Sequence, residues 1–118
     1  MQIGLLKYFL LVPVISVMLN NQCNKPVDGI PACVISKIDS IKKEPKWNPP
    51  AEVKEYEYKN QRVFLFSSNC CDQFIMLYDG SCNYICAPSG GFTGKGDGKC
   101  SEFYKEAKFL KLVWKDDR

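Results

Sequence analysis

The chain has 118 residues, a formal net charge of +3 and seven cysteines, but no histidine. This length fits one domain rather than two, and so small a positive excess gives no reason to expect a nucleic-acid partner. Without histidine, the Cys–His and His–His zinc patterns and the usual hydrolase triads are excluded, so we expect no resident metal, no cofactor and no enzymatic activity.

The N-terminal segment predicts export. Residues 8–19 form an uncharged run that is apolar at every position except Ser16. A run of this length matches the hydrophobic core of a signal peptide, whereas a membrane-spanning helix needs about 20 residues. We interpret residues 1–22 as a signal peptide and expect an extracytoplasmic protein. The alternative is an N-terminal strand or helix buried in the domain.

Cys23 is the predicted anchor. It follows the apolar run and its short polar tail directly, and setting it aside makes the number of remaining cysteines even. We therefore predict that Cys23 is the first mature residue and carries lipid, which makes the protein a membrane-anchored lipoprotein; the alternative location is secreted or periplasmic. Asn20 and Gln22 depart from the usual lipoprotein cleavage pattern. The alternative is a free or intermolecularly paired seventh thiol.

A polar tether over residues 23–31 leads into a single domain, residues 32–118. The first predicted element is a helix over residues 32–44, which Pro45 ends. Its apolar positions recur with helical spacing. They are Val34, Ile38 and Ile41.

Strands dominate the rest of the chain. Period-two patterns and turn residues predict four antiparallel strands, followed by a short helix and a last strand. These elements span residues 52–58, 62–67, 73–78, 83–86, 101–109 and 110–114. The second strand is almost wholly apolar, which indicates a central strand covered on both faces. The fold class is therefore α+β, with the N-terminal helix packed on a meander of four to five strands.

A glycine-rich loop over residues 87–99 is the candidate binding site. It holds five of the chain's eight glycines, and its spacing fits neither a phosphate-binding loop nor a calcium loop. One interpretation is a series of tight turns between two cysteines. The other is a recognition loop that presents Phe92, Lys95 and Asp97.

Six cysteines remain for the domain, and in a small exported protein they predict three disulfides. They are Cys33, Cys70, Cys71, Cys82, Cys86 and Cys100. A two-residue turn at Asp79-Gly80 or Gly80-Ser81 places Cys86 opposite Gln73 or Ile75, so we expect it to pair with Cys70 or Cys71. A vicinal Cys70–Cys71 bridge is the rarer alternative, and a four-cysteine zinc site is disfavoured in an oxidising compartment.

Several short motifs resemble a family of small bacterial lipoprotein domains with no assigned function. The resemblance covers about residues 32–116. Its most specific parts are Cys70-Cys71-Asp72-Gln73 and Gly94-Lys95-Gly96-Asp97-Gly98; further matches are Asn48-Pro49-Pro50-Ala51-Glu52-Val53, Tyr56-Glu57-Tyr58, Leu77-Tyr78-Asp79 and Ile85-Cys86-Ala87-Pro88. The resemblance implies an anchored extracytoplasmic domain and supplies no activity and no catalytic residue.

Two functions fit these patterns. The first is a binding or interaction module of the cell envelope, with a protein or glycan partner. A groove floored by Trp47, Tyr56 and Tyr58 would favour it. The second is a small inhibitor of an extracellular enzyme that uses the glycine-rich loop as a rigid plug, which an exposed convex loop would favour. A purely structural envelope role is a third possibility.

Overall fold

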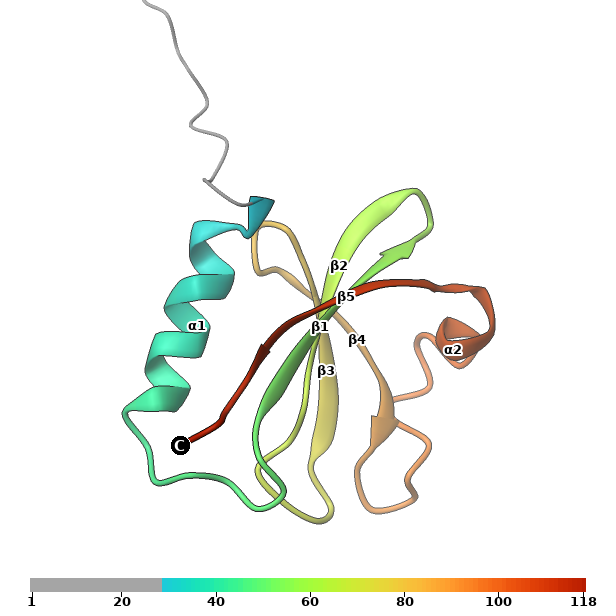
Figure 1. Cartoon of the computed structure of the whole chain (residues 1–118). Coiled ribbons are helices and arrows are strands. Elements are labelled where there is room, and N and C mark those ends of the chain that lie inside the picture. The colour runs from blue at the N-terminus through green and yellow to red at the C-terminus, as the bar shows by residue number, and fades with distance from the viewer. Residues whose placement is uncertain (1–28) are drawn as a thin grey trace, which may run out of the picture.

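The computed structural model describes residues 29–118, and they form an α+β domain, as predicted (Figure 1). The predicted signal peptide, Cys23 and most of the predicted tether lie outside the described residues. The elements are α1 (Ala32–Lys42), β1 (Glu52–Tyr58), β2 (Gln61–Phe66), β3 (Phe74–Asp79), β4 (Tyr84–Gly90), α2 (Phe103–Glu106) and β5 (Lys108–Lys115). Within this part of the chain, no helix has the length and apolar character needed to cross a membrane.

The five strands form one antiparallel sheet in the order β4-β3-β2-β1-β5. The first four strands make the predicted meander. The chain then leaves β4 at one edge, forms α2, and returns as β5 at the other edge, beside β1 (Figure 1). β2 is therefore the central strand.

β2 is buried on both faces. Val63 and Leu65 belong to a core cluster that contains Phe103 of α2, whereas Phe64 and Phe66 belong to a second cluster that contains Val34 of α1. Adjacent strand residues point to opposite faces, so two separate layers must cover the sheet. The prediction of a strand covered on both faces is confirmed.

One cover is α1. Its predicted apolar stripe is confirmed, because Val34 and Ile38 are buried and Ile41 packs against the same cluster. The helix is held at both ends. The guanidinium of Arg62 donates to the Gly29 carbonyl oxygen just before α1, and that of Arg118 donates to the carbonyl oxygens at positions 42 and 44, at 2.9 and 3.0 Å.

The other cover is the segment between β4 and β5. It is less helical than predicted, because α2 spans four residues and Ala107 is already extended. The side chain of Phe103 fixes this short helix by packing edge-on against Tyr56 and Tyr58, with ring centroids 5.0 and 5.2 Å apart. β4 is longer than predicted and runs through Pro88. An edge strand tolerates proline because its outward N–H is not needed in the ladder.

The β3–β4 connection differs from the predicted two-residue turn. The Asp79 carboxylate accepts the backbone N–H groups of Ser81 and Asn83, both at 2.9 Å, and so stabilises a longer turn. The register shifts accordingly, and Cys86 lies opposite Leu77 rather than Gln73 or Ile75. Cys86 is buried in the core cluster that contains Leu77 and Phe103, and it bonds to Cys100 instead of Cys70 or Cys71.

The six cysteines form three disulfides, as predicted, but the expected partner of Cys86 is wrong. The bonds are Cys33–Cys82, Cys70–Cys71 and Cys86–Cys100. Cys33–Cys82 ties α1 to the β3–β4 turn, and Cys86–Cys100 ties the second cover to β4. Each layer over the sheet is therefore joined to it by one covalent bond. The vicinal bond Cys70–Cys71 joins neither cover.

The two cover disulfides should stabilise the domain by different amounts. They close loops of sequence separation 49 and 14. The chain-entropy relation gives about 4 kcal/mol for Cys33–Cys82 and about 3 kcal/mol for Cys86–Cys100. Denaturant unfolding of the Cys33→Ala/Cys82→Ala and Cys86→Ala/Cys100→Ala double variants measures both losses. If either double variant is as stable as the wild type, the corresponding disulfide does not stabilise the domain.

Candidate functional site

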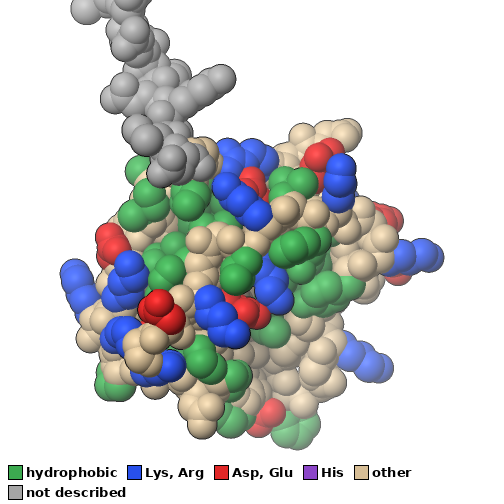
Figure 2. Space-filling view, viewed as in Figure 1, with side chains coloured by type: hydrophobic (Ala, Val, Ile, Leu, Met, Phe, Trp, Pro, Cys, Tyr) green, Lys and Arg blue, Asp and Glu red, His purple; other side chains and the backbone are tan. Residues whose placement is uncertain are grey.

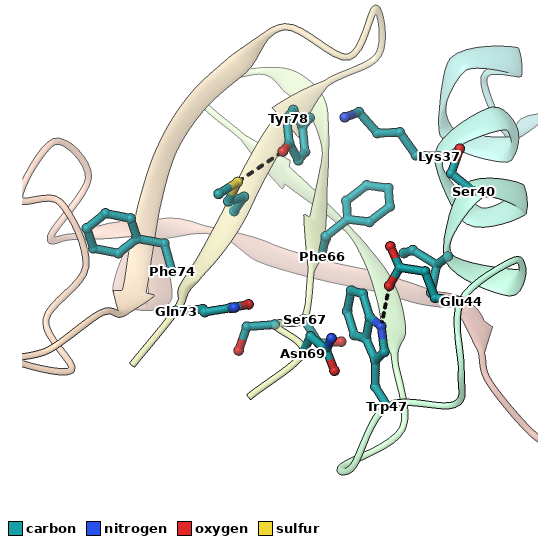
Figure 3. Close-up of a pocket in the computed structure, with 13 residues that line it drawn as sticks. Lys37, Ser40, Glu44, Trp47, Phe66, Ser67, Asn69, Gln73, Phe74 and Tyr78 are labelled. Atoms are coloured by element: carbon teal, nitrogen blue, oxygen red, sulfur yellow. Dashed lines mark hydrogen bonds between the residues drawn. The ribbon is translucent and has the colours of Figure 1, made fainter. Parts of the chain in front are cut away.

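A groove of about 520 Å³ lies between the C-terminal half of α1 and β3 (Figure 3). α1 packs over Val53, Phe64 and Phe66, so the part of β3 that begins at Phe74 stays uncovered. The groove is lined by Lys37, Ser40, Ile41, Glu44, Trp47, Phe66, Ser67, Ser68, Asn69, Gln73, Phe74, Met76 and Tyr78.

Aromatic and thioether groups form the groove's apolar part. The rings of Phe66 and Tyr78 meet edge to face, with their centroids 5.4 Å apart. The Tyr78 hydroxyl donates to the Met76 sulfur at 3.1 Å, and Phe74 remains 40 % exposed beside them. Trp47 approaches from the connection after α1 (Figure 3). Burial raises the pKa of Tyr78 above its ordinary value.

The two charged groups at the groove are engaged by aromatic side chains. The Trp47 indole N–H donates to the Glu44 carboxylate at 2.8 Å, and the Lys37 ammonium lies 4.2 Å from the centroid of the Tyr78 ring. Figure 3 shows Lys37 reaching from α1 toward Tyr78 on β3, and Trp47 beside Glu44 near the end of the helix. The two charges have opposite sign, so the groove carries no net charge that would favour a strongly ionic ligand.

The opposite lip is the loop between β2 and β3, which offers neutral hydrogen-bonding groups. Ser67 is committed to the fold, because its hydroxyl accepts the Glu52 N–H at 2.8 Å. Ser68, Asn69 and Gln73 add a hydroxyl and two amides to the groove lining. The exposed Cys70–Cys71 bond lies between Asn69 and Gln73 in the chain and constrains this lip.

Pockets of this kind, apolar with a few oriented polar groups, bind ligands through shape and a small number of hydrogen bonds. An aromatic floor packs against an apolar ligand face. Amides and hydroxyls both donate and accept, so they match hydroxyl-rich or amide-rich ligands. The arrangement therefore suits a neutral ligand with one apolar face and a polar perimeter.

The aromatic groove expected from the sequence does not form. Trp47 lines the groove described above, but Tyr56 and Tyr58 lie on the opposite face of the sheet, packed against Phe103. Sequence reasoning missed the aromatic residues of β2 and β3. The signal was present, because Phe74, Met76 and Tyr78 alternate with Ile75 and Leu77 and so share one face of their strand.

The glycine-rich loop lies along the β4 edge. Three backbone hydrogen bonds join it to β4 or to its end: Gly90 N–H to the Gly94 oxygen at 3.3 Å, Gly96 N–H to the Gly90 oxygen at 3.0 Å, and Asp97 N–H to the Ala87 oxygen at 3.0 Å. The loop thus pairs the backbone groups that an edge strand would otherwise expose.

The three predicted loop residues have different surroundings. Phe92 is 91 % exposed and Lys95 is exposed. Asp97 is half-buried, and its carboxylate accepts the Tyr84 hydroxyl at 2.5 Å and the Lys99 N–H at 3.0 Å. The hydrogen bond from Tyr84 lowers the pKa of Asp97. Desolvation and the same bond raise the pKa of Tyr84 to about 12. Asp97 therefore holds the loop to β4.

Residues 39–116 match the family described as Domain of unknown function (DUF6970), and the chain belongs to this family. The match starts within α1 and includes all of the sheet and the groove apart from Lys37, but not Cys33. No curated protein and no solved structure is detectably similar to the chain. Among residues 29–118, no group of three or more His, Cys, Asp or Glu side chains is arranged to hold a metal ion.

Gly96 should be the least replaceable glycine of the loop. A Cβ at Gly96 would overlap the Ala87 carbonyl oxygen, whereas a Cβ at Gly94 would meet nothing within 4 Å; the φ angles are nearly equal, +72° and +76°. Gly94→Ala should lower the free energy of unfolding by about 1–2 kcal/mol, because alanine disfavours the left-handed backbone conformation at this position. Gly96→Ala should cost clearly more in thermal or denaturant unfolding. Equal losses would mean that the loop does not press against β4.

Asp97 should contribute to stability, unlike its neighbour Lys95. Asp97→Ala removes two hydrogen bonds and should lower the free energy of unfolding by about 1 kcal/mol. Tyr84→Phe removes one hydrogen bond and should lower it by less. Lys95→Ala should change the free energy of unfolding by no more than about 0.5 kcal/mol. The folded pKa of Asp97 lies below its ordinary value of 3.8. Its contribution is therefore present above about pH 4 and is lost as pH falls through the folded pKa. Asp97→Ala and wild type should converge in stability at low pH; a gap that does not depend on pH would contradict this role.

Proposed function

We propose that the protein is an exported, lipid-anchored binding module of the cell envelope, without catalytic activity, and that it holds a glycan in the groove between α1 and β3. The single observation that carries this proposal is the groove itself, with aromatic rings on its floor and neutral hydroxyl and amide groups on its lip. Membership of a family without assigned function neither favours nor opposes it.

A glycan fits the groove better than an ionic ligand does. The C–H face of a sugar ring packs against aromatic rings, and its hydroxyl and acetamido groups match Ser68, Asn69 and Gln73. Phe74 and Met76 are 40 % and 38 % exposed, so the groove is accessible to solvent and to a large ligand. An anchored envelope protein would meet such ligands at high local concentration.

The anchor proposal rests on the sequence. The apolar run over residues 8–19 has signal-peptide length, and Cys23 follows it closely. The described domain begins only a few residues later, where the Gly29 carbonyl accepts from Arg62. Lipid on Cys23 would therefore hold the α1 end of the domain near the membrane.

Glycan binding should depend on Trp47. The probe is a soluble fragment of cell-wall glycan, and Trp114→Phe leaves Trp47 as the single tryptophan that reports on the groove. The fragment should shift the Trp47 emission of this variant. In titration calorimetry, which needs no fluorophore, the fragment should bind Trp47→Ala about thirtyfold more weakly than wild type, because truncation of a central aromatic contact costs about 2 kcal/mol of binding free energy. Tyr104→Ala, which removes an exposed aromatic ring on the opposite sheet face, is the matched control and should bind normally.

Two results would contradict the glycan proposal. One is an unchanged Trp47 emission at millimolar fragment. The other is equal loss of affinity in the Trp47 and Tyr104 variants, which would place binding outside the groove.

Membrane attachment should require Cys23. Cys23→Ser removes the only thiol that we expect to carry lipid, so the domain should move from the membrane fraction to the soluble fraction with an unchanged melting temperature. Metabolic labelling with a fatty-acid analogue measures the lipid directly. Retention of the variant in membranes, or absence of label from the wild type, would contradict the anchor.

A second candidate function, inhibition of an extracellular enzyme, is favoured by one observation. Phe92 is 91 % exposed in a loop whose ends are joined by Cys86–Cys100. A rigid loop that presents one aromatic side chain resembles a plug for an active-site cleft. In that case the purified domain should inhibit a secreted protease or glycosidase, and Phe92→Ala should abolish inhibition while leaving Trp47-dependent glycan binding intact.

A further inference from the structure

One of the three disulfides does not hold the fold together. The other two each join a cover to the sheet, whereas Cys70–Cys71 links two consecutive residues of the loop between β2 and β3. A disulfide stabilises a fold mainly by constraining the unfolded chain, and the effect grows with the number of residues that the bond encloses. A bond with a sequence separation of 1 encloses none, so this mechanism does not explain the Cys70–Cys71 bond.

The Cys70–Cys71 bond is also the accessible one. Both of its cysteines are exposed, whereas the cysteines of the other two bonds are half-buried or buried. A thiolate must reach a disulfide sulfur to open the bond, and exposed disulfides are the labile ones in proteins. On the face that Figure 2 shows, basic and acidic side chains are intermingled, so charge marks no preferred approach from that side. Exposure therefore decides which bond a reductant meets first.

The bond lies in the middle of a loop that is fixed at its two ends. At the β2 end, the Ser67 N–H donates to the Glu52 carbonyl oxygen at 3.0 Å. At the β3 end, the Gln73 carbonyl oxygen accepts the Gly91 N–H at 3.0 Å. Among the described residues, no backbone hydrogen bond joins positions 68–72 to another segment. The disulfide is therefore the one covalent constraint on this stretch besides the chain itself.

The constrained turn positions the groove lip. Cys71 has a positive φ of 29°, in a region that residues with a side chain rarely adopt and that recurs at switch segments. The Gln73 N–H closes the turn by donating to the carbonyl oxygens of Cys71 and Cys70, at 2.5 and 3.3 Å. Ser68 and Asn69 precede the turn, and they line the groove together with Gln73 (Figure 3). When the bond opens, Cys71 can relax to a common backbone conformation, and the lip is released with it.

We propose that Cys70–Cys71 is a thiol–disulfide exchange site for a dithiol reductant, and that its oxidation state sets the shape of the groove lip. The exchange itself needs no ligand in the groove. Its effect on glycan affinity rests on the proposed function.

The exchange proceeds in two steps. One thiolate of the reductant attacks the Sγ atom of one cysteine, the Cys70–Cys71 bond breaks, and the other cysteine leaves as a thiolate that takes up a proton. The second thiolate of the reductant then attacks the reductant sulfur of the mixed disulfide, and the first cysteine leaves in the same way. Two electrons and two protons pass from the dithiol to the cysteine pair, and the reductant ends as a disulfide.

Reduction should be selective for this pair. The full mature chain is incubated with increasing dithiothreitol, trapped with iodoacetamide and mapped by peptide mass spectrometry. Cys70 and Cys71 should become alkylated at a reductant concentration at least about tenfold below that needed for the two cover disulfides. The melting temperature should not change at that concentration. Reduction of a cover disulfide together with this pair, or a lower melting temperature when only this pair is reduced, would overturn the proposal.

Hydrogen exchange measures the response of the lip. On reduction, the Gln73 amide should lose protection while the β2 amides do not change. Cys70→Ser/Cys71→Ser cannot form the bond, so its Gln73 amide should exchange fast with or without reductant. Asp72→Asn changes a neighbouring exposed residue but keeps both cysteines, and it should respond to reductant as wild type does. Gln73 exchange that is equal in the two redox states would overturn the proposal.

Calorimetry with the cell-wall glycan fragment separates this proposal from the glycan proposal. The fragment should bind the reduced protein and Cys70→Ser/Cys71→Ser about tenfold more weakly than the oxidised wild type, because a released lip must be ordered on binding. Equal binding to both redox states would contradict control of the groove by the disulfide. If the fragment binds neither state, the glycan proposal fails, and the alkylation and the Gln73 exchange still decide whether the exchange site exists.

Discussion

The burial of β2 on both faces is the constraint on which the rest of this domain depends. Four consecutive apolar residues, Val63–Phe66, are buried, and alternate ones face opposite sides of the sheet. A sheet with one wet face would leave two of them in water, at about 1.5–3 kcal/mol each. The chain therefore supplies two unrelated covers, α1 before the sheet and the α2 segment after β4.

The positions of the candidate sites follow from how far these two covers reach. α1 extends over β1 and β2 but leaves the start of β3 bare, and the groove forms there. The second cover leaves from β4, and its glycine-rich part closes the β4 edge. It then delivers the chain to the opposite edge, so β5 ends the sheet without a neighbour. Two disulfides fix the covers, and the third, Cys70–Cys71, constrains only the loop at the groove lip.

Local patterns predicted the elements well, because each depends on residues close in sequence. The helical spacing of Val34 and Ile38 and the apolar run of β2 gave the helix and the central strand correctly. The Cys86 partner was missed because it depends on the turn after Asp79, whose carboxylate binds two N–H groups and lengthens the connection. Composition alone also could not reveal that Asp97 holds the glycine-rich loop through Tyr84 or that α1 stops short of Phe74. Both are contacts between segments distant in sequence.

Native-state hydrogen exchange of the isolated domain tests the central claim most directly. If both faces of β2 are covered, the amides of Val63–Phe66 should open only with global unfolding and should be among the slowest in the sheet, with the edge strands β4 and β5 exchanging faster. If the Cys86–Cys100 bond is removed, the free energy of opening at the β2 amides should fall by the same amount as the free energy of global unfolding. Exchange at β2 as fast as at β5 would mean that one face of the sheet is open, and the groove would then not lie where the two covers place it.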